Sequence, residues 1–93
     1  MIKSFRDEAL ERCWREGRCA RVPAGLRRRV LMKLDSMDAA ACLDDLRHPP
    51  GNRLHLLRGE YEGRWALAVS GPWRLVFRFH DGHVYDVLLT QYH

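Results

Sequence analysis

The sequence predicts an α+β domain in which N-terminal helices pack on one face of a C-terminal antiparallel sheet. Apolar residues recur at helical steps up to about residue 46 and alternate with polar residues from Arg53 onward. The run His-Pro-Pro-Gly-Asn at 48–52 separates the two patterns and is typical of a loop. Helices first and strands after indicate segregated layers. At this length, residues 1–93 are expected to form one domain.

Two helices are expected in the first half of the chain. In the first, the apolar residues Leu10, Cys13 and Trp14 fall at i, i+3 and i+4. Ser4 or Asp7 can cap its N-terminus, and Gly17 can end it. The second begins near Pro23, a residue favoured at the first helical position. Its predicted buried stripe is Leu26, Val30, Leu34 and Met37. Residues 2–5 are a weaker candidate for an edge strand, and residues 39–46 for a short helical turn.

Four strands are expected in the second half. They begin near residues 53, 64, 73 and 83, and the turns at Gly71-Pro72 and Asp81-Gly82 join the last three. Because successive side chains of a strand point to opposite faces of the sheet, Leu54 and Leu56 are expected to face the helices. His55 and Arg74 are expected to point to the opposite, open face. The polar candidates are therefore expected on an accessible surface.

The charge and the cysteine content of the chain indicate its partners and its redox compartment. Lys and Arg exceed Asp and Glu by 16 to 12, almost all as arginine, which suits phosphate contact but leaves nucleic-acid binding open. Three cysteines without Cys-x-x-Cys spacing predict free thiols in a reducing cytoplasm and no metal site. Neither a spanning apolar run nor a secretory signal is present, so a cytoplasmic protein without a membrane partner is expected.

Five residues near strand positions or at the chain end form a candidate catalytic set for RNA cleavage without a metal or organic cofactor. They are His55, Arg58, Arg74, Tyr92 and His93. An imidazole can take the proton of a 2′-hydroxyl, an acid can protonate the leaving 5′-oxygen, and guanidiniums can hold the phosphate. Each residue also has an ordinary explanation as a solvated strand or tail residue. Composition and spacing alone therefore predict a basic α+β domain and leave RNA binding open.

An ordered set of short motifs adds to this prediction. The segments are Met1-Ile-Lys-Ser-Phe5, Pro49-Pro-Gly-Asn-Arg-Leu-His55, Leu57-Arg-Gly59, Gly63-Arg-Trp65, Trp73-Arg-Leu-Val-Phe-Arg-Phe79, Asp81-Gly82, Tyr85-Asp86 and Tyr92-His93. In order and spacing they resemble the HigB toxins of the RelE-like toxin–antitoxin superfamily over nearly the whole chain. The resemblance implies the RelE-like toxin fold.

The resemblance also implies an activity and partners. It implies a ribosome-dependent mRNA endonuclease that enters the A site of the 70S ribosome and uses the neighbouring 2′-hydroxyl as nucleophile. It implies a cognate, HigA-like helix-turn-helix antitoxin, through which the toxin reaches operator DNA. The family's functional positions match His55, Arg74, Tyr92 and His93 directly, with the two histidines as base and acid in either order.

Two positions depart from the family pattern. Arg58 stands where the family usually has Lys, so the charge is kept but its geometry changes. Gln91 stands where the family often has a carboxylate, and an amide cannot accept a proton in catalysis. Two alternatives follow: an inactive antitoxin-binding co-repressor, or a plain RNA-binding module.

Overall fold

The first helix begins and ends where its capping residues predict. The computed structural model describes residues 1–92, and in it α1 spans Glu8–Glu16. Asp7 is the N-cap, and its side chain accepts a hydrogen bond of 3.1 Å from the Leu10 amide. Gly17 ends the helix at φ 74°, in the left-handed region. Both predicted boundaries are confirmed.

The segment after α1 corrects the cysteine prediction. Cys13 and Cys19, expected as free thiols, form a disulfide, and Cys42 remains free and exposed. Cys13 is buried on the apolar face of α1, and the turn after Gly17 brings Cys19 back beside it. Sequence spacing does not reveal such a local return of the chain.

The second helix carries the predicted apolar stripe. Pro23 precedes a short 3₁₀ turn, η1 (Ala24–Leu26), which continues into α2 (Arg27–Ala39). Val30, Leu34 and Met37 are fully buried. Within residues 1–92, every helix is too short or too polar to span a bilayer.

Two further 3₁₀ turns connect α2 to the sheet, η2 (Leu43–Arg47) and η3 (Pro50–Asn52). Asn52 is 1% exposed, and its amide nitrogen donates to the carbonyls of Leu46 at 3.1 Å and His48 at 3.0 Å. Its amide oxygen accepts a hydrogen bond from Lys33 of α2. The predicted loop is therefore fastened to the helix by one buried amide.

The sheet has four antiparallel strands in the order β1-β2-β3-β4: His55–Leu56, Trp65–Ser70, Trp73–His80 and His83–Gln91. The two-residue turn at Asp81-Gly82 has φ values of 49° and 78°, as a type I′ hairpin requires. The first strand is shorter than predicted, because Arg53 adopts a left-handed conformation (φ 48°) that interrupts the extended chain. Leu56, predicted to face the helices, is 53% exposed.

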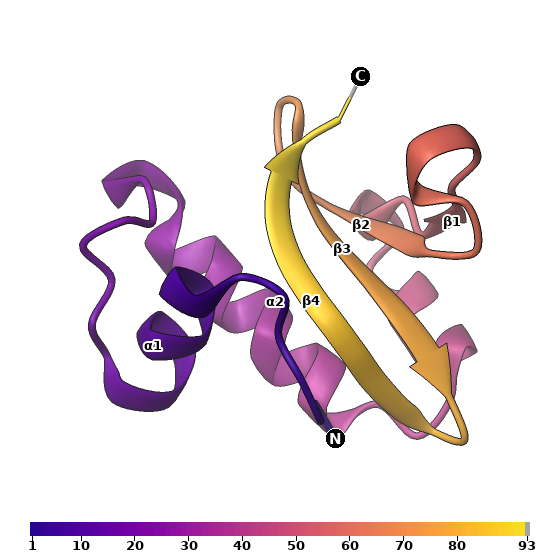
Figure 1. The fold of residues 1–93 in the computed structure, drawn as a ribbon. Coiled ribbons are helices and arrows are strands. Elements are labelled where there is room, and N and C mark those ends of the chain that lie inside the picture. The colour runs from indigo at the N-terminus through magenta and orange to yellow at the C-terminus, as the bar shows by residue number, and fades with distance from the viewer. Residues whose placement is uncertain (93) are drawn as a thin grey trace.

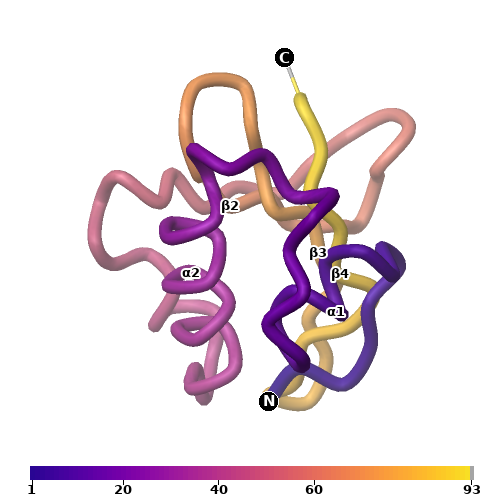
Figure 2. Tube along the Cα trace, turned by 90° about the vertical axis from the view of Figure 1, so that its left-hand side faces the viewer, coloured from indigo at the N-terminus to yellow at the C-terminus, as the bar shows by residue number. Residues whose placement is uncertain are grey.

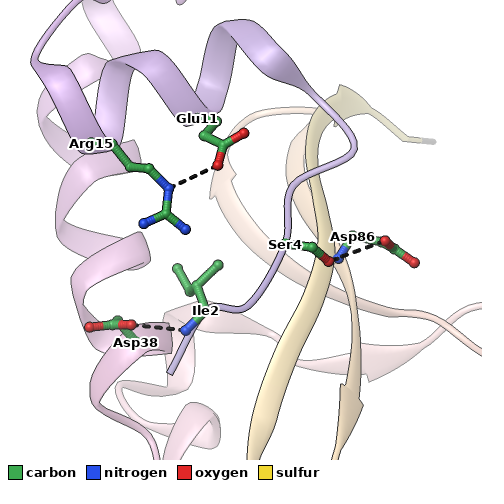
Figure 3. A network of polar contacts seen from close by, with 6 residues as sticks. All are labelled: Ile2, Ser4, Glu11, Arg15, Asp38 and Asp86. Carbon is green, nitrogen blue, oxygen red and sulfur yellow. Dashed lines mark hydrogen bonds and ion pairs between the residues drawn. The ribbon is translucent and has the colours of Figure 1, made fainter.

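The N-terminal segment lies along β4. Ile2 and Phe5 form isolated parallel bridges to Val84 and Val87. The Ile2 amide also donates to Asp38 of α2 at 2.8 Å, which ties the chain start to both layers (Figure 3). The weak edge strand predicted at residues 2–5 is thus present as two bridges.

Apolar side chains lie on both faces of the sheet. The larger core lies between the sheet and the two helices, which stand on one side in Figure 1. On the other side, the segment after β1, with the turn η4 (Gly59–Tyr61), covers a smaller cluster of Leu57, Ala66 and Val76. The face predicted to be open is therefore covered at its centre and accessible around it.

Candidate active site

The sheet register places His55 and Arg74 on the same face, opposite the helices. His55 pairs with Ala66, which pairs with Val76, while Arg74 lies between Ala68 and Thr90 in the adjacent row. The Cα atoms of His55 and Arg74 are two strand spacings and two residues of rise apart, which corresponds to about 12 Å. Ala66 and Val76 lie between them and are buried, so a phosphodiester that met both side chains would lie over the cover of the smaller cluster.

The His55 imidazole has one nitrogen engaged and one free. His55 is exposed on β1, and its Nδ1 lies 2.8 Å from the carbonyl oxygen of Arg53. A carbonyl oxygen can only accept, so Nδ1 carries the hydrogen in this arrangement. In the neutral ring, Nε2 then has the free lone pair. This geometry suits a general base that acts through Nε2.

The Arg74 guanidinium is held above the β2–β3 turn. Its Nη1 donates to the carbonyl oxygens of Gly71 at 2.5 Å and Trp73 at 2.9 Å. Those bonds leave Nε and Nη2 available as donors. Within residues 1–92, Arg74 forms no ion pair with a carboxylate. The site thus presents an oriented cation whose charge no acidic side chain offsets.

Tyr92 lies at the same end of the sheet. Its backbone N–H donates to the carbonyl of Pro72 at 2.9 Å, so the chain end runs beside the β2–β3 turn (Figures 1 and 2). Its ring packs on the smaller apolar cluster and meets Tyr61 edge-on, with centroids 6.3 Å apart. His93, the fifth predicted residue, lies outside the described residues.

Neither Arg58 nor Gln91 lines the hollow at Arg74. Arg58 precedes η4 and is exposed, without an ion pair or side-chain hydrogen bond among residues 1–92. Gln91 pairs with Trp73 in the register. Trp73 packs against the helix-side core, so Gln91 lies on the face opposite Arg74.

A shallow hollow of about 300 Å³ opens beside Arg74, and Arg53, Ser70 and Gly71 also line it. Sequence reasoning assigned no role to Arg53, because it treated this residue as part of a regular strand. It also missed Tyr61, the aromatic neighbour of Tyr92. The only sequence signal for Tyr61 is an aromatic residue in a glycine-bounded loop, which does not identify its partner.

Asp86 on β4 lies beside a second hollow, which Arg74 does not line. This larger hollow of about 450 Å³ is lined by Arg78, Tyr85 and Asp86, and Arg78 pairs with Asp86 at 3.6 Å. Ser4 holds Asp86 by donating to its carboxylate at 3.3 Å, as Figure 3 shows. In the part of the chain that the structure describes, no three His, Cys, Asp or Glu side chains gather as a metal site. In this hollow the Arg78 charge is offset by Asp86, whereas Arg74 forms no ion pair within residues 1–92.

Comparisons with known proteins concern the chain as a whole. Residues 3–93 match the family model described as "RelE-like toxin of type II toxin-antitoxin system HigB". The chain is 33% identical over 93 residues to the "Endoribonuclease HigB" of Proteus vulgaris, with 100% of both chains covered. It is 35% identical over 83 residues to "Toxin HigB-1" of Vibrio cholerae, covering 88% of this chain and 87% of that one. The structure has a helical layer on a four-stranded antiparallel sheet, and the family model matches almost the whole chain. This protein therefore belongs to the HigB family of RelE-like toxins of type II toxin–antitoxin systems.

Proposed function

We propose that residues 1–93 act as one toxin domain that cleaves mRNA on the ribosome in the cytoplasm. The observation that carries the proposal is the shared sheet face of His55 and Arg74, with a guanidinium that no carboxylate within residues 1–92 neutralises. The name of the Proteus vulgaris relative, an endoribonuclease, supports the same reaction.

In the proposed reaction, Nε2 of His55 takes the proton of the 2′-hydroxyl that precedes the scissile bond. The 2′-oxygen forms a bond to phosphorus while the bond from phosphorus to the 5′-oxygen breaks. His93 gives its proton to the leaving 5′-oxygen. The products are a 2′,3′-cyclic phosphate and a 5′-hydroxyl. The Nδ1 contact to the Arg53 carbonyl supports the assignment of His55 as the base.

The remaining residues stabilise and position the phosphate. Arg74 places its free N–H groups against the developing charge on the equatorial oxygens, a role worth about 10²–10³ in rate. Arg58 adds a second positive charge, and Tyr92 orients the phosphate or stacks on a base. The packing of Tyr92 on the smaller cluster supports an oriented ring.

The shape of the site supports dependence on the ribosome. The two hollows on the sheet are shallow, and a domain of 93 residues has little surface with which to fix a flexible RNA strand. Orientation of reacting groups is worth about 7–11 kcal/mol of barrier. We propose that the decoding centre supplies it by holding the codon. We further propose a HigA-like helix-turn-helix antitoxin as the partner that carries the toxin to operator DNA.

The test compares Arg74→Ala with Arg78→Ala on programmed 70S ribosomes and on free RNA. Both arginines are on β3, but Arg78 is paired with Asp86. Wild type and Arg78→Ala are expected to cut ribosome-bound mRNA far faster than free RNA, and Arg74→Ala to lose about 10²–10³ in rate. The 5′ ends of the products locate the cut. Full activity of folded Arg74→Ala, or equal rates on free RNA, contradicts the proposal.

A further inference from the structure

Three arginines from three separate segments meet beside the β2–β3 turn. Arg53, after η3, and Arg74, on β3, line the same hollow. Ser70, which also lines it, accepts a hydrogen bond of 3.2 Å from Nη1 of Arg29 on α2. Arg29 is therefore held next to a residue that lines the hollow, although it does not line the hollow itself.

This region is positively charged without internal compensation. Among residues 1–92, none of the three arginines forms an ion pair, whereas Arg78 in the larger hollow pairs with Asp86. Lys33, one turn beyond Arg29, has a lowered pKa, chiefly because of burial and also because of the Arg29 charge. Four cations near one another, with no carboxylate paired to them in this part of the chain, favour an anionic ligand.

The walls of the hollow suit a phosphate group. Gly51 and Gly71 line it, and a Cβ added at either position would have no heavy atom within 4 Å. A ligand can therefore approach the protein backbone closely. The lining offers no exposed large apolar side chain, which a protein partner would need as an anchor. Guanidiniums over small residues fit a sugar–phosphate backbone better than a peptide.

We propose that Arg53 and Arg29 form a second phosphate-binding subsite, which holds an RNA backbone phosphate next to the one bound by Arg74. This inference rests on the proposed function in one respect only, since that function identifies the RNA cleavage at the neighbouring Arg74. The two arginines are positioning residues. Their loss weakens RNA binding and raises KM, and for Arg29, which lies on α2, this change comes without a change in kcat.

The test measures binding of a fluorescent single-stranded RNA with 2′-O-methyl groups throughout, which cannot be cleaved, across a series of KCl concentrations. The variants are Arg53→Gln and Arg29→Gln, and Arg53→Lys is the charge-preserving rescue. Arg47→Gln is the matched control, because Arg47 is exposed but pairs with Asp44 at 3.3 Å. Each subsite variant is expected to bind about three- to tenfold more weakly and to lose about 0.7 from the slope of log K against log salt. Arg53→Lys is expected to recover the slope.

Two further arms identify the source of the phosphate. A loss of affinity for empty 70S ribosomes, without a change on the oligonucleotide, assigns the phosphate to ribosomal RNA. A loss on the oligonucleotide, with a raised KM in ribosomal cleavage, assigns it to mRNA. If wild type cleaves nothing but the salt slopes change, the proposed function fails and the subsite stands.

The subsite is overturned if both variants match Arg47→Gln in every RNA measurement. It is also overturned if wild type binds neither RNA nor ribosomes, or if only the affinity for the antitoxin falls. Arg29→Gln keeps the test decisive should Arg53→Gln fold poorly, because Arg29 is exposed on a regular helix.

Discussion

The contact between Tyr61 and Tyr92 is expected to couple the turn η4 to the active site. The two rings meet edge-on at 6.3 Å and 62° over the smaller apolar cluster. Aromatic pairs of this geometry contribute about 0.5–1.5 kcal/mol beyond their buried area. The prediction is that a double-mutant cycle of Tyr61→Leu and Tyr92→Leu gives a coupling free energy of unfolding in that range. In a domain of this size, 1 kcal/mol corresponds to about 4–8 °C in Tm.

The same substitution should lower activity. In Tyr61→Leu the backbone of Tyr92 stays bonded to Pro72, but the ring loses its lateral neighbour. Misplacement of a site group by about 1 Å can cost 10²-fold. We therefore expect kcat on ribosome-bound mRNA to fall by about 10- to 10²-fold, with KM nearly constant. Tyr61→Phe keeps the ring edge and should behave like wild type.

The assay combines urea denaturation of the four proteins in the cycle with single-turnover cleavage on programmed ribosomes. A coupling free energy below about 0.3 kcal/mol would show that the two rings act independently. A normal coupling with full cleavage by Tyr61→Leu would refute the idea that Tyr92 needs a fixed ring, and would remove it from the proposed mechanism.

Two predictions concern stability. In urea denaturation, Gly82→Ala should destabilise the fold more than Gly17→Ala, because at Gly82 the new Cβ would lie 3.3 Å from the Ala41 carbonyl oxygen and at Gly17 it would meet nothing within 4 Å. Both glycines have φ near 75°, and this left-handed conformation alone costs about 1–2 kcal/mol for alanine. Equal losses of stability would contradict the steric argument. Hydrogen bonds from the Ala41 and Cys42 amides lower the pKa of Asp45 from 3.8, so its contribution to stability is fully present above that pH and is lost as pH falls through the folded pKa. Wild type should therefore be more stable than Asp45→Asn at neutral pH and converge with it in acid; a constant difference across the pH range would exclude ionisation as the cause.

Local signals predicted the helices and the hairpins because their causes are local. The cap at Asp7 and the turn at Asp81-Gly82 need only a few neighbouring residues. The first strand was predicted too long because Arg53 is the left-handed C-cap of η3, with its backbone N–H bonded to the Pro50 carbonyl at 3.2 Å, and strand periodicity does not reveal such a turn. That error hid the role of Arg53, whose carbonyl contacts His55 and whose side chain lines the hollow.

The candidate site was predicted in part for a related reason. Alternation correctly placed His55 and Arg74 on one face, because antiparallel register preserves that order. It could not show that Leu57 and Tyr61 fold back over the centre of this face. The cover over the sheet and the local return that forms the Cys13–Cys19 bond both depend on packing between segments, which periodicity does not record.

The position of the Gln91 amide gives no physical reason to expect an inactive co-repressor. The register places Gln91 with Trp73, on the face opposite Arg74. His55 has its own support, since the Arg53 carbonyl fixes the hydrogen on Nδ1 and leaves Nε2 free to accept a proton. A base oriented by a carbonyl needs no neighbouring carboxylate to adopt the correct tautomer, although it gains no charge stabilisation once protonated. Because Gln91 lies on the opposite face, Gln91→Glu should change the cleavage rate on programmed ribosomes little, and a large gain in rate would contradict this placement.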